Sequence, residues 1–305
     1  KPSQIALPAI GALGGIVIPA AIFWLFNHGD DFAIRGWAVP TATDIAFVIG
    51  ILALLGKRVP SGLKIFLLTL AVVDDLCAIL IIALFYTDHL SMASFLIAGF
   101  LLGVMWLLNY ARVTKKSVFV FLTFLLWISV LNSGVHATIA GVLAAFCIPT
   151  VDRNGNRMLD EFYHDLEGVT NFFILPIFAF VNAGVALTGI NPNQLLNSVS
   201  YGIFFGLFFG KQLGIFIFTF VFIKILRLGS LPSGATWTQL YGVCILGGIG
   251  FTMSLFVNGL AYENSDKFFF ADKLSILVAS FASGLLGYLF LYFYSKVNEK
   301  KLSEN

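Results

Sequence analysis

Charged side chains are scarce in this sequence, and cysteines are few. Lysine, arginine, aspartate and glutamate make up 11% of the 305 residues, whereas they make up roughly a quarter of a soluble domain. A net charge of +2 with scattered basic residues argues against a nucleic-acid-binding surface. Cys77, Cys147 and Cys244 lie in apolar runs without metal-ligand spacing, so we interpret them as small buried side chains. The composition therefore excludes an ordinary soluble domain.

Long polar stretches and a leader segment are also lacking. The longest polar stretch, residues 150–165, has only the length of a loop and is interpreted as a linker between two groups of apolar segments. The first apolar run begins at residue 5, and the residues before it lack the basic region and cleavage site of a signal peptide. We therefore expect one membrane domain over residues 1–305 that is incomplete at its N-terminus.

What the sequence has in abundance is apolar segments long enough to cross a bilayer, which takes about 20 residues. This predicts an all-α polytopic membrane protein with ten spans. The predicted spans are 5–26, 37–56, 63–86, 93–110, 117–131, 134–149, 166–188, 201–223, 238–261 and 273–295. Most lysines and arginines fall in one set of alternate loops and tails, and the opposite set holds only Arg35, Lys267 and Lys273. Because basic residues concentrate on the cytoplasmic side, both ends of the chain are predicted to be cytoplasmic.

Four ionisable residues fall inside predicted spans: Asp44, Asp74, Asp75 and Lys211. Each costs about 2.5–3.5 kcal/mol on insertion, which makes each a candidate for function. Asp74 and Asp75 are adjacent, so on a helix they point about 100° apart and contact different neighbours. Protons and sodium ions would compete for the same carboxylate oxygens, which is the chemistry of an exchanger. The alternative for the pair is hydrogen bonding between helices alone.

Lys211 needs an anionic partner at membrane depth, and Asp74 and Asp75 are both candidates. Such a pair could couple ion binding to movement or could be purely structural. The glycines around this lysine recur every fourth residue, which predicts close helix packing. They are Gly202, Gly206, Gly210 and Gly214.

Two predicted spans carry residues that interrupt a helix. In the second span these are Pro40, Thr43 and Asp44, with Asp44 placed to cap the following half-helix. The ninth span is interrupted by Gly247, Gly248, Gly250 and Thr252. Two broken spans in matching positions predict an inverted-repeat secondary transporter whose breaks cross beside the aspartate pair. The predicted repeats are 5–86 and 201–295, joined by connecting and interface spans over 87–200.

Two weaker signals concern pH. His136 lies among small residues, as either a proton relay or a packed helix residue. His164 stands with Glu161 and Glu167 at the entrance of a span, as either a pH-responsive cluster or a solvated helix end.

Several stretches resemble NhaA-type bacterial sodium/proton antiporters along nearly the whole chain. They are PTATDIAFVIGILALLGKRVP, LKIFLLTLAVVDDLCAILIIALFYT, NSGVHATIAGV, ILPIFAFVNAGV, GKQLGI and GGIGFTMSLF. The resemblance implies a twelve-span fold whose spans 3–12 are the ten predicted here. It implies that Asp75 is the central sodium and proton carrier, that Asp74 is a second carboxylate paired with Lys211, and that Thr43 and Asp44 form the unwound-helix site.

The resemblance also implies an activity and a setting. Such proteins sit in the bacterial inner membrane and exchange cytoplasmic Na⁺ or Li⁺ for external protons, electrogenically and with activation at alkaline pH. The family's pH-sensing region maps onto residues 160–167, where Tyr163 stands at the position that is acidic in the family. The resemblance implies no enzymatic activity and no cofactor, and a homodimer whose contact uses a hairpin outside this sequence.

Four other functions are alternatives to sodium/proton exchange. A sodium-coupled solute symporter would share the broken helices, and an ion channel would differ only in gating and coupling. An intramembrane aspartyl protease would need a G-x-G-D pattern, which the sequence does not contain. A prenyl-transferring enzyme would need further carboxylates after the aspartate pair, where the sequence reads LCA.

Overall fold

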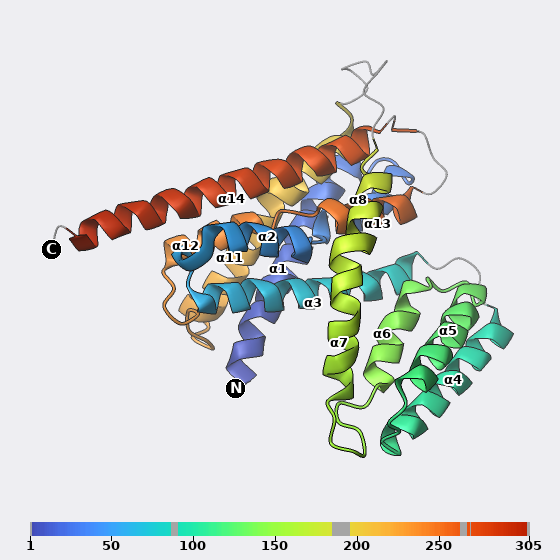
Figure 1. The fold of residues 1–305 in the computed structure, drawn as a ribbon. Helices are drawn as coiled ribbons and strands as arrows, with labels where there is room; N and C mark the ends of the chain where they lie inside the picture. The colour runs from blue at the N-terminus through green and yellow to red at the C-terminus, as the bar shows by residue number, and fades with distance from the viewer. Residues whose placement is uncertain (1, 87–90, 185–195, 263–266, 269, 304–305) are drawn as a thin grey trace. The chain divides into compact units, whose positions relative to one another are not determined.

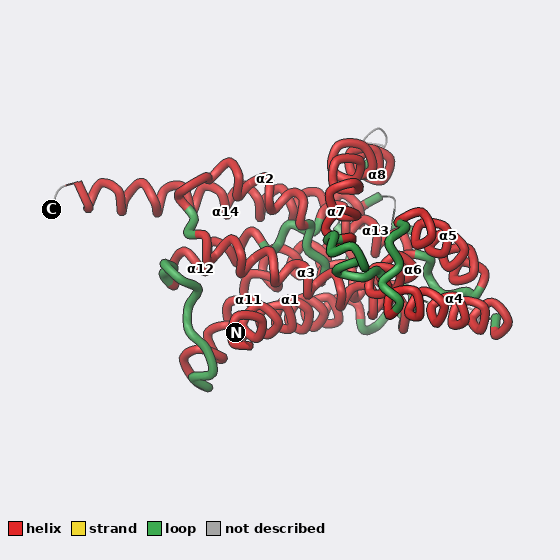
Figure 2. Tube along the Cα trace, turned by 60° about the horizontal axis from the view of Figure 1, so that its bottom comes forward, coloured by secondary structure: helices red, strands yellow, loops and turns green. Residues whose placement is uncertain are grey.

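The structure is a computed structural model that describes residues 2–86, 91–184, 196–262, 267–268 and 270–303. The described residues form helices and connecting loops without strands (Figure 2). The chain divides into two compact units, one made of residues 1–78 with 178–305 and the other of residues 79–177. The predicted all-α class is confirmed.

The first unit contains most of the helices (Figure 1). They are α1 (Pro2–Asn27), the 3₁₀ helix η1 (Ala33–Thr41), α2 (Ile45–Leu55), the 3₁₀ turn η2 (Gly56–Arg58), most of α3 (Ser61–Phe85), most of α8 (Leu175–Asn182), α10 (Ser198–Phe205), the π-helical turn η4 (Gly206–Gly210), α11 (Lys211–Phe220), the π-helical turn η5 (Val221–Ile225), α12 (Trp237–Leu246), α13 (Phe251–Ala261) and α14 (Ala271–Ser303). The second unit contains α4 (Met92–Tyr110), α5 (Lys116–Asn132), α6 (Thr138–Cys147), α7 (Met158–Val169) and the π-helical turn η3 (Thr170–Ile174).

Within the described residues, 7 helices are long and apolar enough to cross a membrane, or 8 if the bent pair α12 and α13 counts as one span. Two further apolar helices, α5 and α6, have 10–17 residues. The count of ten spans therefore stays a prediction. The predicted segment 134–149 starts too early, because Gly134 adopts a φ of 86° and the helix begins only at Thr138. The end of the predicted segment 166–188 lies outside the described residues.

Both predicted interruptions are present. Ala42 and Asp44 have extended backbones between η1 and α2, and α12 and α13 are bent by 46° around the glycine-rich break. Each break falls in the second span of its predicted repeat. Whether 5–86 and 201–295 are inverted copies stays a prediction.

Close packing of α1 against α10, η4 and α11 is confirmed by the glycines that line their contact. A Cβ atom added to Gly214 would overlap the backbone carbonyl of Gly14, and one added to Gly206 or Gly210 would press on a proline of a neighbouring segment. Small residues let helix backbones approach in this way. The packing matters for the site because Lys211 begins α11.

We expect Gly214→Ala to lower the free energy of unfolding by roughly 1–3 kcal/mol, because backbone cannot yield to the added methyl group. Thermal unfolding of the purified protein in detergent measures this. Gly99→Ala is the matched control, since nothing lies within 4 Å of a Cβ at that position. Equal melting temperatures for the two variants would contradict the packing argument.

An apolar core in the first unit holds the elements that carry the site. Leu52 of α2, Leu67 and Leu70 of α3, and Val243 and Leu246 of α12 are all fully or almost fully buried in one cluster. Burial of such side chains stabilises a soluble protein by removing them from water. Within a bilayer the same contacts act through close packing. They fix α3 against both broken spans.

Candidate functional site

The two broken spans cross, and hydrogen bonds join them. The Asp44 N–H donates to the Ile249 carbonyl at 2.7 Å, and the Thr43 hydroxyl donates to the Gly247 carbonyl at 3.1 Å. At membrane depth no water is available to satisfy backbone groups released by a break, so each break serves as partner for the other. The predicted placement of Asp44 against the glycine-rich break is confirmed.

The Asp44 carboxylate joins the ends of two half-helices. One oxygen accepts from the Phe47 N–H at 3.1 Å and caps the start of α2. The other accepts from the Thr252 N–H at 2.9 Å and from the Thr252 hydroxyl, at the start of α13. The positive ends of both half-helices therefore face one negative charge, which is the favourable arrangement for helix dipoles.

Asp74 of α3 pairs with Lys211 of α11. The Nζ–Oδ2 distance is 2.5 Å, and both side chains have 0% exposure. Thr43 lies next to the same carboxylate. Lys211 directly follows the π-helical turn η4, and such turns are frequent at functional sites. Of the two partners that the sequence left open for Lys211, the structure assigns Asp74.

Asp75 has different surroundings from its neighbour. Asp75 is only partly buried as a residue, and neither of its carboxylate oxygens is paired with Lys211. Its Oδ1 atom is buried without a hydrogen-bond partner among the described residues, as is the Oδ1 atom of Asp74. Asp44, Asp74 and Lys211 are near enough to interact with it electrostatically. Asp75 thus offers an uncommitted carboxylate oxygen beside an ion pair, as expected for adjacent residues that point in different directions on a helix.

The site is built from oxygen atoms. Within the described parts of the chain, no group of three His, Cys, Asp or Glu side chains could hold a metal ion. A cation bound at Asp75 would therefore draw on carboxylate, hydroxyl and carbonyl oxygens, which suit hard ions. The hydroxyl of Thr43 and the carboxylates of Asp74 and Asp75 are the candidates, and their role as ligands stays a prediction.

The residues proposed for a pH response all lie in the second unit. His164 is 3.9 Å from Glu167 in α7. Glu161 and Asp165 both lie 2.8 Å from Lys116 at the start of α5, and hydrogen bonding to these carboxylates raises the pKa of that lysine. Lys116 carries no signal in the sequence, because its partners are 45 or more positions away in the chain.

His136 is partly buried and lies in the turn before α6, not within a helix. The interpretation of this residue as packed within a helix is therefore wrong, because the left-handed Gly134 delays the helix start. Its role in a pH response stays a prediction.

Ser280 of α14 supports the glycine-rich break, and no pattern in the sequence points to it. The Ser280 hydroxyl accepts from the Gly250 and Phe251 N–H groups at 3.2 and 3.0 Å, which satisfies donors at the start of α13. Thr252 was already marked in the sequence as a hydroxyl residue at the glycine-rich break. Ser280 carries no such signal, because only the fold brings α14 to the break.

We expect Thr252→Val to destabilise the crossing by roughly 1.5–3 kcal/mol, the value typical of a hydrogen bond to a charged group. Thermal unfolding in detergent measures the loss. Thr252→Ser keeps the hydroxyl and should retain most of the stability, so equal losses in both variants would contradict a role for the hydroxyl.

Comparisons with known proteins give one consistent result. Residues 1–291 match the protein family described as Na⁺/H⁺ antiporter 1. A Na⁺/H⁺ antiporter NhaA 2 from Campylobacter fetus is 65% identical over 305 residues, which are 100% of this chain and 77% of that protein. A Na⁺/H⁺ antiporter NhaA from Campylobacter curvus is 56% identical over 98% of this chain and 75% of its own length. A Na⁺/H⁺ antiporter NhaA 1 from Campylobacter jejuni is 54% identical over 97% of this chain and 76% of its own length.

Proposed function

The chain belongs to the Na⁺/H⁺ antiporter 1 family, and from this premise we propose that it exchanges sodium ions for protons across a membrane. The observation that carries the proposal is the unpaired Asp75 carboxylate oxygen beside the buried Asp74–Lys211 pair, at the crossing of two broken spans. Ionisable groups at this depth are costly, and transporters retain them for ion pathways.

In the proposed mechanism a proton and a sodium ion compete for Asp75. The carboxylate binds one or the other, so arrival of sodium releases the proton and arrival of a proton releases sodium. Asp74 and Lys211 hold a charge pair beside this carboxylate. Thr43 and Asp44 fix the crossing that lines the site through their bonds to the opposite break.

The direction of ion movement, the pH control, the location and the oligomeric state are part of the same proposal. Cytoplasmic Na⁺ or Li⁺ leaves in exchange for external protons, electrogenically and under pH control that involves Glu161, His164, Glu167 and His136. The protein acts as a transporter without enzymatic activity or resident cofactor, in the bacterial inner membrane with a cytoplasmic C-terminus, and as a homodimer. The names of the relatives support exchange over the alternative of sodium-coupled solute symport.

The test is a flux measurement in everted membrane vesicles that contain the protein. A pre-formed pH gradient, acid inside, should collapse on addition of Na⁺ or Li⁺, with saturation and a fixed ratio of ions to protons. Choline is the control cation. Uncoupled or non-saturating flux would identify a channel, and sodium-driven uptake of an organic solute would identify a symporter. Either result would contradict the proposal.

A further inference from the structure

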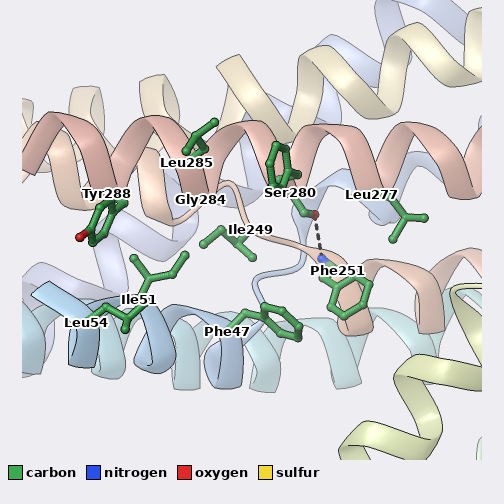
Figure 3. A pocket seen from close by; sticks show the side chains of 11 residues that line it. Phe47, Ile51, Leu54, Ile249, Phe251, Leu277, Ser280, Gly284, Leu285 and Tyr288 are labelled. Atoms are coloured by element: carbon green, nitrogen blue, oxygen red, sulfur yellow. Dashed lines mark hydrogen bonds between the residues drawn. The ribbon is translucent and has the colours of Figure 1, made fainter.

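An apolar groove of about 500 Å³ runs between α2 and α14 in the first unit (Figure 3). Its floor is Ile249, which lies in the glycine-rich break. The backbone carbonyl of Ile249 accepts the hydrogen bond from the Asp44 N–H. The side chains that line it are Phe47, Ile51, Leu54, Ile249, Phe251, Leu277, Ser280, Phe281, Leu285 and Tyr288, with Gly284 between them. The hydroxyl of Ser280 is engaged by two backbone N–H groups. The groove therefore offers carbon surface and almost no free polar partner.

The groove lies on two segments that are suited to cross the membrane, 33–58 and 271–297. Leu54 and Phe281 at its edges are each 72% exposed, so the groove opens onto the apolar outer surface of these segments. On α14 its lining extends from Leu277 to Tyr288, roughly 16 Å at 1.5 Å per residue. An acyl chain is the apolar molecule that a bilayer supplies to a groove of this kind.

One end of the groove is basic. Beyond Leu54, α2 passes into η2, which carries the exposed side chains of Lys57 and Arg58. The Arg58 guanidinium lies 4.9 Å from the ring centre of Tyr292, one helical turn after Tyr288. Among the residues that the structure describes, neither Lys57 nor Arg58 forms a salt bridge. Two positive charges thus stand where the polar end of a lipid in the groove would lie.

We propose that this groove binds an anionic phospholipid. One acyl chain packs between α2 and α14 against Ile249 and Phe251, and Arg58 and Lys57 bind the phosphate of the headgroup. Charge complementarity selects this occupant, because an apolar groove alone would accept any lipid, whereas basic residues at the membrane surface favour anionic ones. The site depends on membrane insertion alone, so it holds whichever ion the protein carries.

The position of the groove gives the bound lipid access to the crossing. Ile249 bonds to Asp44 through its backbone, and Phe47 packs edge-on against Phe251 with ring centres 4.6 Å apart. An acyl chain packed on these side chains would stabilise both breaks from the lipid side. Anionic lipid is therefore expected to raise the melting temperature of the protein in detergent.

Native mass spectrometry of the purified chain tests the headgroup contact, with long-chain phosphatidylglycerol and phosphatidylcholine of matched chains as probes. Wild-type protein should prefer phosphatidylglycerol. Lys57→Ala/Arg58→Ala should weaken its binding at least about tenfold, since each charge near the surface contributes roughly 1 kcal/mol. Phosphatidylcholine should lose less, because its choline group offsets the charge of its phosphate. Lys115→Ala/Arg153→Ala removes two exposed charges elsewhere and should have no effect. Equal loss in both double variants would overturn the proposal.

A second variant tests the groove itself. Leu54→Trp places a larger side chain at an exposed groove edge, where the fold can tolerate it, and should reduce binding of long-chain phosphatidylglycerol. Inorganic phosphate and dihexanoyl phosphatidylglycerol should compete poorly, because they lack the long acyl chain. Undiminished lipid binding in Leu54→Trp, or full competition by inorganic phosphate, would overturn the groove assignment. A change in oligomer mass with unchanged lipid binding would assign the groove to a second copy of the chain instead.

Discussion

Asp75→Asn is expected to abolish sodium-driven proton movement, to the level of vesicles that lack the protein. The asparagine side chain has nearly the same shape as aspartate, so the fold and the Asp74–Lys211 pair should persist. It neither releases a proton nor carries the negative charge that attracts a cation. Loss of exchange with an unchanged melting temperature would separate a carrier residue from a structural one.

Two further variants complete this test. Asp31→Asn removes an exposed acidic residue from the same unit but outside the site, and it should exchange like wild type. Asp75→Glu keeps the chemistry but moves the carboxylate by one methylene group, so exchange should persist at a lower rate and with altered sodium affinity. Retained sodium-driven exchange in Asp75→Asn would sink the assignment of Asp75 as the carrier.

Much of the architecture could be predicted because it follows from local constraints. A bilayer demands long apolar helices, so the long spans are visible as apolar runs. Pro40 and the glycines at 247–250 cannot continue a regular helix without cost, which marks both breaks. Asp44 at the first break had few uses other than to cap a half-helix, and the structure places it there.

The choice between partners was not predictable, because it depends on rotation about a helix axis. Asp74 and Asp75 differ by one residue, and both lie at membrane depth. Only the placement of α11 beside α3 decides that Asp74 faces Lys211. The placement of α11 in turn depends on its close packing against α1, through glycine contacts such as Gly14 with Gly214, which no local pattern pairs. Long-range contacts also explain why Ser280 could not be predicted, since its hydroxyl accepts from Phe251, 29 positions away.

Lys211→Met is expected to destabilise the protein by about 3–5 kcal/mol, the cost of leaving a buried charge without its partner. Asp74 has 0% exposure, and its Oδ2 accepts from Lys211 at 2.5 Å, so its charge would lose its nearest counterion. Asp74→Asn should be destabilising for the converse reason, because it leaves a buried ammonium group. Thermal unfolding in detergent at constant pH measures both, and Lys115→Ala is the exposed control.

The double variant Asp74→Asn/Lys211→Met decides what the single losses mean. If the two charges stabilise each other, removing both leaves no buried charge, and the double variant should be more stable than either single variant. A coupling energy of several kcal/mol between residues separated by 137 positions would then measure the contact between α3 and α11 directly. Strictly additive losses would mean that the two side chains do not meet in the membrane. In that case neither residue could hold the charge pair beside Asp75, and the proposed site would lose its second carboxylate.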